Sequence, residues 1–449
     1  MYITRVVIEN IRGFDEGDRN IDISFARPSG QYAGWTVLAG RNGAGKSTFL
    51  KSIALAVAGP AAARALQESF AGWIRSGKKS ATVATQLAFD SCDRFERTGR
   101  IPATTFWTGL KWDGEEGQEP AITEYQLNKK MKQTPERGPW TEEPKGWFVA
   151  GYGPFRRLTG HASDAQRLMV GPNHVPRLVS LFREDASLVE AAQWLKDVYL
   201  RRLEKKPGAD ILERNTISLL NDGMLPDGVS IERVDSDGLW VKKDSAILPL
   251  RDLSDGYRTS IALVLDIIRH MHKVYGDFQI ESQDFDEEDG TTSTHLIVPY
   301  PGVVLIDEID VHLHISWQQR IGYWLKHRFP KVQFIVSSHS PFVCQAADPG
   351  GLIRLAAPGE NERTHVASPT LHKRVVLGTA DEAVMSELFG VESTRSPISE
   401  QLLRELSVLE AKALRGIATE QDRKRMKQLQ LELPLTPSAE VQLALEGLT

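Results

Sequence analysis

The stretch from Gly40 to Thr48 constrains the fold of this chain more than any other, and it reads "GRNGAGKST". It fits the pattern G-x-x-x-x-G-K-[ST], follows the strand-like run "WTVLAG" and precedes the helical run "FLKSIALAVA". A loop of this kind links a strand to a helix whose N-terminus faces a phosphate. A glycine-rich turn that binds nothing is the alternative, but the Lys-Ser pair and both flanks disfavour it.

The residue types of this loop suit a nucleotide with several phosphates. Glycines allow the backbone N–H groups to turn toward the phosphates, and the positive end of the helix dipole adds to the attraction. We expect Lys46 to reach the β- and γ-phosphates and the Ser47 hydroxyl to bind Mg²⁺. The predicted nucleotide-binding residues are Gly40, Asn42, Gly43, Ala44, Gly45, Lys46, Ser47 and Thr48.

Composition excludes several other classes of protein. The 449 residues are 41% hydrophobic and 25% charged, which is typical of globular proteins, and the net charge of −5 disfavours a chain that binds nucleic acid through overall basicity. Cys92 and Cys344 form no CxxC pair, which fits a reducing cytosol and disfavours a zinc hook. The start, "MYITRVVIEN", is strand-like, and no apolar run reaches the ~18 residues of a membrane span. We expect a soluble cytoplasmic protein without a membrane partner.

Two acids end a second apolar run, "VVLIDEIDVHLH". Asp307 and Glu308 follow a strand expected to be buried on both faces, and ligands of open α/β sheets bind at the carboxyl ends of such strands. Asp307 is expected to bind Mg²⁺, partly through water, and Glu308 to act as the general base for the attacking water. A surface turn is the alternative, which the phosphate loop makes less favourable.

His339 ends the next buried strand, in "FIVSSHSPF". A histidine at a strand end is usually structural, but this position suits a contact with the γ-phosphate or the attacking water. In the turn after the acids, we expect Asp310 to contact a second subunit. His312 and His314 are better explained as turn or dimer-contact residues than as metal ligands, because no further ligands are nearby.

A third loop, "RDLSDGYRTS", spans residues 251–260 and feeds the apolar run "IALVLDII". A serine and a glycine directly before a helix suit an anion at the helix start. The chain thus has two candidate phosphate sites that are far apart in the sequence.

The order of these motifs resembles that of the ABC-type ATPases, and within them the RecF/SMC-like branch. The resemblance covers roughly residues 1–60 and 245–345 and implies that ATP is the nucleotide. It implies that Ser254 and Gly256 of "LSDGYR" contact the γ-phosphate of ATP held by another copy. It also implies that Arg12, in "IENIRGF", lies beside the nucleotide.

Two positions depart from the signature of that family. Asp255 stands where the family has glycine, and Tyr257 where it has Gln or Glu. An acid near a γ-phosphate is unfavourable, so we expect Asp255 to point away or to cap the following helix, with Arg258 offsetting its charge. The residue that senses the nucleotide is either Gln86, which an ordinary exposed strand position explains better, or a member of "GYGPFRR" at 151–157.

The predicted fold is α/β, an ABC-type P-loop ATPase head with a mixed sheet and flanking helices. The interval between Ser47 and Ser254 is too short for long coiled-coil arms, so a short helical insert is expected. The predicted parts are an ATPase lobe at 1–160, the insert at 161–215, the remaining head at 216–370 and a C-terminal helical domain for assembly or partner binding at 371–449. Caps at Ser396-Pro397 and Thr436-Pro437 delimit the tail helices, and the acidic "ESQDFDEEDG" is expected to be a solvated loop.

The tail and the motif set resemble the ATPase subunits of bacterial anti-phage systems, of the Septu type and the retron-associated type. That resemblance implies an ATPase whose ATP-dependent dimerisation, or higher even-numbered assembly, controls a separately encoded effector such as a nuclease. No Asp-x-Asp strand follows residue 345, so a nuclease within this chain is not expected. Two alternatives stay open: a RecF-like, DNA-binding repair ATPase that uses basic runs such as "RRLEKK" at 201–206, and an ATP-bound scaffold with little turnover.

Overall fold

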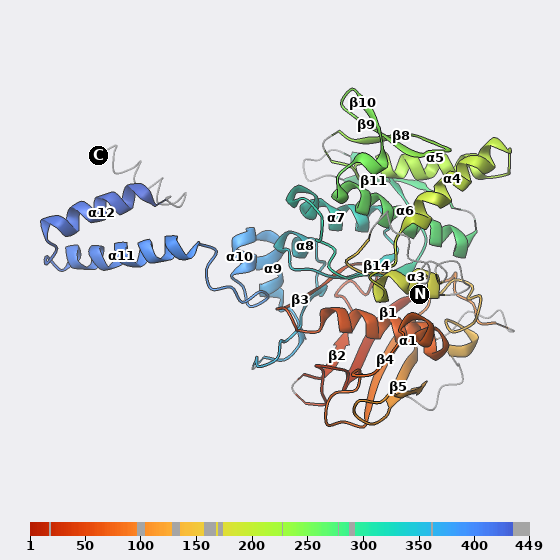
Figure 1. Cartoon of the computed structure of the whole chain (residues 1–449), viewed down its shortest axis with the longest axis horizontal. Coiled ribbons are helices and arrows are strands. Elements are labelled where there is room, and N and C mark those ends of the chain that lie inside the picture. Colours follow the sequence, from red (N-terminus) through yellow and green to blue (C-terminus); the bar gives the residue numbers. More distant parts are fainter. Residues whose placement is uncertain are drawn as a thin grey trace. The chain divides into compact units, whose positions relative to one another are not determined.

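The structure is a computed structural model, and it describes residues 1–433 apart from 18, 97–103, 128–134, 157–167, 169–173, 227, 277, 287–291 and 361. The chain divides into two compact units, residues 1–390 and residues 391–449, and Figure 1 shows the elements of each. The first unit contains every residue of the predicted nucleotide site. The boundaries at 160, 215 and 370 stay predictions.

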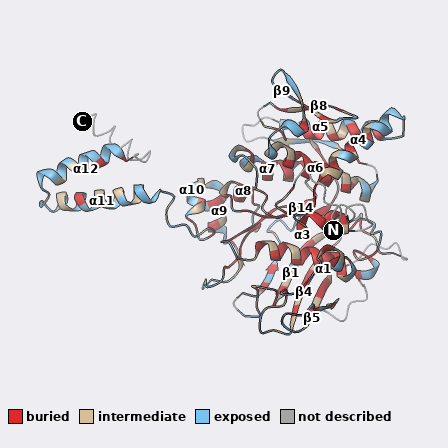
Figure 2. Cartoon of the chain, in the orientation of Figure 1, coloured by how far each residue is buried: buried red, intermediate tan, exposed pale blue. Residues whose placement is uncertain are grey.

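A six-stranded sheet forms the centre of the first unit. Its order is β16 (His365–Val366), β15 (Leu352–Arg354), β3 (Gly34–Ala39), β14 (Val332–Ser337), β13 (Gly302–Ile306) and β7 (Val149–Tyr152). All neighbouring strands are parallel except the pair β15 and β16. The strands β13 and β14 are buried along their whole length, as expected of parallel strands covered on both faces, and Figure 2 shows this core. The parallel strands therefore end at one edge of the sheet.

An antiparallel sheet lies on the other side of the helix that follows the phosphate loop. Its order is β2 (Ile21–Ser24), β1 (Tyr2–Glu9), β4 (Ser80–Ala88), β5 (Phe106–Asp113) and β6 (Ala121–Glu124). Helix α1 (Lys46–Leu66) contacts both sheets and lies along β1, β4 and β5 in Figure 1. The Gln333 amide of β14 joins the sheets, because Oε1 accepts from Ile3 N at 2.7 Å and Nε2 donates to Ile3 O at 2.9 Å. The predicted α/β fold with a mixed sheet is confirmed.

Helix α1 has a kink at Gly59, directly before Pro60. Gly59 has φ 87° and ψ 172°, and the chain resumes a helical course at Pro60. An added Cβ at Gly59 would lie 2.7 Å from Trp140, so only glycine fits this close approach. By length and composition α1 could cross a membrane, but it is mostly buried inside the protein and is weak support for a span.

Helices and a small sheet cover the upper part of the first unit in Figure 1. The helices are α4 (Val189–Leu203), α5 (Ala209–Asn221), α6 (Asp255–Tyr275) and α7 (Ile315–Arg328). Helix α3 (Val175–Phe182) instead packs against α1 and β7 in the middle of the unit in Figure 1. Strands β8 (Ser230–Asp235) and β9 (Gly238–Lys243) form an antiparallel hairpin, with β10 (Ala246–Pro249) as a third strand. Among the helices of the described residues, the longest have 21 residues, so that part of the chain contains no long coiled coil.

The acidic stretch after residue 280 is a strand rather than the predicted loop. Strand β11 (Glu281–Asp286) pairs antiparallel with β12 (Thr292–Ile297). The prediction was wrong because it counted only charge: an exposed two-stranded ribbon leaves acids in water, and Thr294 Oγ1 donates to Asp284 Oδ1 across the pair at 2.7 Å. The acids at 287–289 lie outside the described residues.

Helices end the first unit and make up the described part of the second. Helices α8 (Pro341–Gln345), α9 (Pro369–Leu377) and α10 (Ala380–Val384) belong to the first unit. The second unit contains α11 (Pro397–Leu414) and α12 (Glu420–Glu432). Ser396 caps α11 as predicted, because its side chain accepts from Ser399 N. The cap predicted at Thr436-Pro437 lies outside the described residues.

Candidate functional site

The candidate site lies where three adjacent parallel strands end. Strand β14 pairs with both β3 and β13, so that Leu38, Ser337 and the end of β13 at Ile306 are nearly level in the sheet. The phosphate loop follows β3, the two acids follow β13, and His339 follows β14. Sheet register therefore brings together the three motifs that the sequence predicts to act on one nucleotide.

The phosphate loop has a backbone that only glycine adopts easily. Gly40, Gly43 and Gly45 have φ values of 149°, 78° and 98°. An added Cβ at Gly40 would lie 2.5 Å from the Leu355 carbonyl oxygen, and one at Gly45 would lie 2.7 Å from the Phe14 ring. The loop is thus fixed from both sides before α1 begins at Lys46.

Lys46 lies inside the loop with its charge directed to backbone oxygens. Its Nζ donates to Gly40 O at 2.8 Å and to Arg41 O at 3.3 Å, and the residue is 8% exposed. Burial lowers the pKa of Lys46, while the nearby Asp307 and Glu308 act in the opposite direction. Of the other predicted residues, Asn42 and Gly43 are exposed, Ser47 is half-buried, and Ala44 and Thr48 are buried.

A serine that the sequence reasoning did not single out connects the two acids. Ser337 Oγ donates to Asp307 Oδ1 at 2.5 Å and accepts from the Glu308 backbone N at 2.8 Å. Asp307 is buried, with its N–H donating to Tyr152 O at 2.8 Å. The serine pair in "SSHS" at the end of a buried strand was the signal that could have identified Ser337.

Glu308 combines an uncommon backbone conformation with a partly buried carboxyl beside two other acids. Its φ of 46° is left-handed, which is uncommon for a residue other than glycine. Burial raises the pKa of its carboxyl, and Asp307 and Asp310 raise it further, so that Glu308 is a better proton acceptor than a free carboxylate. Oxygen donors from Asp307 and Ser47 fit Mg²⁺, which prefers few protein ligands together with phosphates and water.

The turn after the acids is tied to the strand that carries His339. Ser338 Oγ donates to Asp310 Oδ1 at 2.6 Å, and His339 N donates to the same oxygen at 3.4 Å. His339 is exposed, and partial burial, followed by nearby Lys46, lowers the pKa of its imidazole, which favours the neutral form. His314 caps α7 by accepting from Ser316 N, which is a structural role.

Arg156 is a second residue that the sequence reasoning did not assign, although it lies in "GYGPFRR". The guanidinium is 2% exposed and donates to the carbonyls of Asp307 at 3.0 Å, Glu308 at 3.1 Å and Ile309 at 3.3 Å. It also donates to Gly153 O at 2.9 Å. Burial lowers the pKa of Arg156 to about 10, so the side chain is charged at neutral pH. A member of the 151–157 segment therefore lies directly behind the acids.

The serine-glycine loop begins α6 as predicted. Ser254 is the N-cap and is exposed, and Asp255 is the first helical residue. Asp255 pairs with Arg258, which bears out the expected offset of its charge. An added Cβ at Gly256 would lie 2.8 Å from the His312 carbonyl oxygen, so glycine lets α6 approach the turn after the acids.

The signature loop faces a cavity of its own and not the phosphate loop of the same chain. A cavity of about 490 Å³ is lined by Ser254, Gly256, Tyr257, His312 and Trp317, among others. Within the described ranges, no hydrogen bond or ion pair joins Ser254 or Gly256 to residues 40–48.

Of the two other predicted residues, Arg12 belongs to a segment that contacts the phosphate loop and Gln86 does not. Arg12 has a φ of 50° and stacks over Trp73, with Cζ 4.8 Å from the ring centroid. Its segment reaches the loop through Phe14. Gln86 is held by Thr4 Oγ1 at 2.9 Å and by Thr105 Oγ1 at 3.2 Å, in the sheet end remote from Phe14. The structure does not bring Gln86 to the acids or to Lys46.

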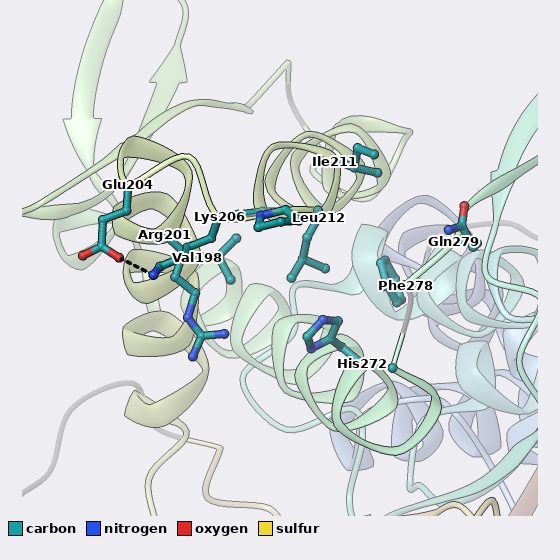
Figure 3. A pocket seen from close by; sticks show the side chains of 13 residues that line it. Val198, Arg201, Glu204, Lys206, Ile211, Leu212, His272, Phe278 and Gln279 are labelled. Atoms are coloured by element: carbon teal, nitrogen blue, oxygen red, sulfur yellow. Dashed lines mark ion pairs between the residues drawn. The ribbon is translucent and has the colours of Figure 1, made fainter.

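The basic run at 201–206 lines a separate cavity of about 630 Å³ between α4, α5 and the end of α6. Figure 3 shows Lys206 paired with Glu204 beside Arg201, and the Lys206–Glu204 distance is 4.0 Å. Arg202 pairs with Glu213 at 2.6 Å. These acids offset part of the positive charge on which the DNA-binding alternative depends.

Two sequence families match the chain. The family described as "AAA domain, putative AbiEii toxin, Type IV TA system" matches residues 158–345, and a family described as "AAA domain" matches residues 5–135. Among solved structures, the chain is similar to "Crystal structure of the SmcHead bound to the C-winged helix domain of ScpA". The identity is 15%, the match covers 82% of this chain and 99% of that chain, and the TM-score is 0.46.

Curated relatives have a higher sequence identity to this chain than the solved structure does. Septu protein PtuA of Bacillus mycoides (strain KBAB4) is 25% identical over 365 residues, which are 80% of this chain and 41% of that protein. The "Retron Ec83 probable ATPase" of Escherichia coli is 40% identical over 110 residues, 24% of this chain and 17% of that protein. The predicted resemblance is confirmed. A second Septu PtuA, from Bacillus thuringiensis, is 28% identical over 42% of this chain and 44% of its own length, so the chain spans less than half of the PtuA proteins it matches.

Proposed function

We propose that this chain binds ATP with Mg²⁺ and hydrolyses it between two copies of itself. The observation that carries the proposal is the convergence of Lys46, Glu308 and His339 at one sheet edge, while Ser254 and Gly256 make no hydrogen bond to the loop of their own chain. A site that needs residues from two copies links nucleotide state to assembly.

The chemistry follows from the positions of these side chains. Bound Mg²⁺, held by Ser47 and Asp307, would neutralise charge on the β- and γ-phosphates. Lys46 stabilises the same charge from within the loop. Glu308 takes a proton from water as the water oxygen bonds to the γ-phosphorus, and the bond from that phosphorus to the bridging oxygen breaks to release ADP. His339 would contact the γ-phosphate in this arrangement.

We further propose a role in prokaryotic anti-phage defence. The names of the relatives, Septu protein PtuA and retron ATPases, support this role. In this proposal the closed, ATP-bound dimer, or a higher even-numbered assembly, holds or releases a separately encoded effector such as a nuclease. The complex would act in the cytoplasm.

Two substitutions test the proposal. Lys46→Ala is expected to abolish nucleotide binding, because the loop loses its only lysine. Glu308→Gln is expected to keep binding, accumulate ATP-bound dimers and stop turnover, because the amide cannot accept the proton. Equilibrium binding of a fluorescent ATP analogue, phosphate release and size-exclusion chromatography measure the three effects.

The outcomes separate the proposal from its rivals. Hydrolysis by Glu308→Gln at the wild-type rate would show that another group is the base. A wild-type protein that binds ATP and dimerises but releases no phosphate would be a scaffold instead. Steeply salt-dependent and ATP-dependent binding to duplex DNA would favour the RecF-like function.

A further inference from the structure

Arg156 makes an unusual set of contacts for a buried arginine. Its Nη1 donates to Gly153 O and Asp307 O, and its Nη2 donates to Glu308 O and Ile309 O. The four N–H bonds of the two terminal nitrogens are thereby matched to four backbone carbonyls. These hydrogen bonds engage no carboxylate, so the side chain acts on the backbone around Glu308 and not as a simple ion-pair partner.

Three of these carbonyls belong to consecutive residues, 307 to 309. In an extended strand, successive carbonyls point in alternating directions, so three of them cannot meet one guanidinium. The left-handed φ of 46° at Glu308 turns the chain and makes the convergence possible. The strained backbone of Glu308 and the guanidinium of Arg156 therefore depend on each other.

The origin of Arg156 explains why it can act as a fixed support. Strand β7 pairs with β13 up to Tyr152 and Ile306, so the segment after β7 leaves the sheet beside the acids. Arg156 folds back within that segment, held by its own Gly153 carbonyl at 2.9 Å. Its charge also lies near the three acids Asp307, Glu308 and Asp310, which oppose the effect of burial on the guanidinium.

We propose that Arg156 is a positioning residue for hydrolysis, which holds the backbone of Glu308 in the conformation that aims its carboxylate at the attacking water. The inference rests on the proposed function, because it assumes that Glu308 is the base. Arg156 does not touch the phosphate loop through any of its hydrogen bonds among the described residues, so its loss should affect turnover more than nucleotide affinity.

The test compares Arg156→Met and Arg156→Lys with the wild type. Methionine fills much of the volume but offers no N–H to the four carbonyls, of which Glu308 O keeps a backbone partner, Val311 N at 3.1 Å. Lysine keeps the charge and offers three donors. We expect the kcat for phosphate release to fall about 100-fold in Arg156→Met and about 10-fold in Arg156→Lys, as for a misplaced catalytic group. The dissociation constant for a fluorescent ATP analogue should stay within about threefold of the wild-type value, about the spread expected where no contact is lost.

A matched control separates positioning from stability. Arg328 is also buried, at 5% exposed, and pairs with Asp222 at the end of α7, away from the acids. Arg328→Lys should lower the melting temperature to a similar extent as Arg156→Lys while leaving kcat at the wild-type level.

The possible results divide clearly. A kcat that stays at the wild-type level in Arg156→Met would overturn the inference, and so would a dissociation constant that rises in step with the loss of kcat. If Arg156→Met does not fold, the kcat of Arg156→Lys decides by the same criteria. Absence of turnover in the wild type would instead refute the proposed ATPase function.

Discussion

Ser337→Ala is the substitution whose effect the structure defines best. Ser337 Oγ bonds both to the carboxylate of Asp307, at 2.5 Å, and to the backbone N–H of Glu308, at 2.8 Å. Alanine fits the strand without strain, so the variant removes two hydrogen bonds and little else. We expect Asp307 to lose its fixed rotamer and the start of the Glu308 turn to loosen.

The magnitude follows from the two bonds. A hydrogen bond to a charged group and a buried N–H left unpaired together cost about 3 kcal/mol of folding free energy. For a unit of nearly 400 residues that corresponds to a fall in melting temperature of about 4 °C. Loss of a group that orients a metal ligand lowers metal affinity or activity by about 10- to 100-fold. The apparent affinity for Mg²⁺ should therefore fall by that factor.

The assay is phosphate release at saturating ATP while free Mg²⁺ is titrated. Ser338→Ala is the matched control, because Ser338 Oγ also donates to an acid, Asp310, at 2.6 Å and accepts from Ser340 N at 2.9 Å. We expect a similar loss of thermal stability in the control but an unchanged Mg²⁺ midpoint. Equal midpoints for Ser337→Ala and the wild type would refute the assignment of Asp307 to Mg²⁺.

Two further predictions concern acid stability and assembly. His174 accepts from Arg177 Nη2 at 2.9 Å, and burial, followed by this arginine, lowers its pKa to about 3. Since the unfolded chain takes up a proton near pH 6.5 and the folded one does not, stability falls as the pH drops below 6.5, by about 2 kcal/mol at pH 5. The melting temperature of His174→Gln should fall less between pH 7.5 and 5, and an equal fall would contradict this account. Gly256→Ala places a Cβ 2.8 Å from the His312 carbonyl oxygen, so the start of α6 must shift. In a Glu308→Gln background, we expect size-exclusion chromatography to show fewer ATP-dependent dimers. An undiminished dimer peak would contradict a contact of the signature loop with the ATP of another copy.

The sequence predicted those parts of the site that local spacing encodes. The phosphate loop needs glycines and a lysine at fixed intervals, so Gly40 to Thr48 is identifiable without a structure. Asp307 and Glu308 were identifiable because two acids end an apolar run. Their proximity to His339 then follows from the parallel order of β3, β14 and β13.

The missed and misplaced residues depend on contacts between distant segments. Ser337 and Arg156 contact the acids because β14 and β7 both pair with β13. The sequence of each segment does not indicate which strand will pair with it. Gln86 was a candidate because of its residue type, but the antiparallel register of β4 with β1 carries it away from the loop. The positions of Ser337, Arg156 and Gln86 relative to the site therefore depend on which strands pair, and residue type alone does not predict them.

Tyr152, at the end of β7, contacts both the segment that carries the acids and the helix that begins with the signature loop. The Tyr152 carbonyl accepts from Asp307 N at 2.8 Å, and its buried hydroxyl donates to Asp266 Oδ2 at 3.0 Å. Asp266 lies in α6, the helix that begins at Ser254, and Arg269 holds its other oxygen at 2.7 Å. Because this contact is buried and charged, sliding α6 against the acids would break it at a high cost in free energy. We therefore expect α6 and the acids Asp307 and Glu308 to move as one rigid body when two copies close on ATP. Ser254 of one copy then cannot contact the ATP of the other copy unless its own acids also lie at the interface.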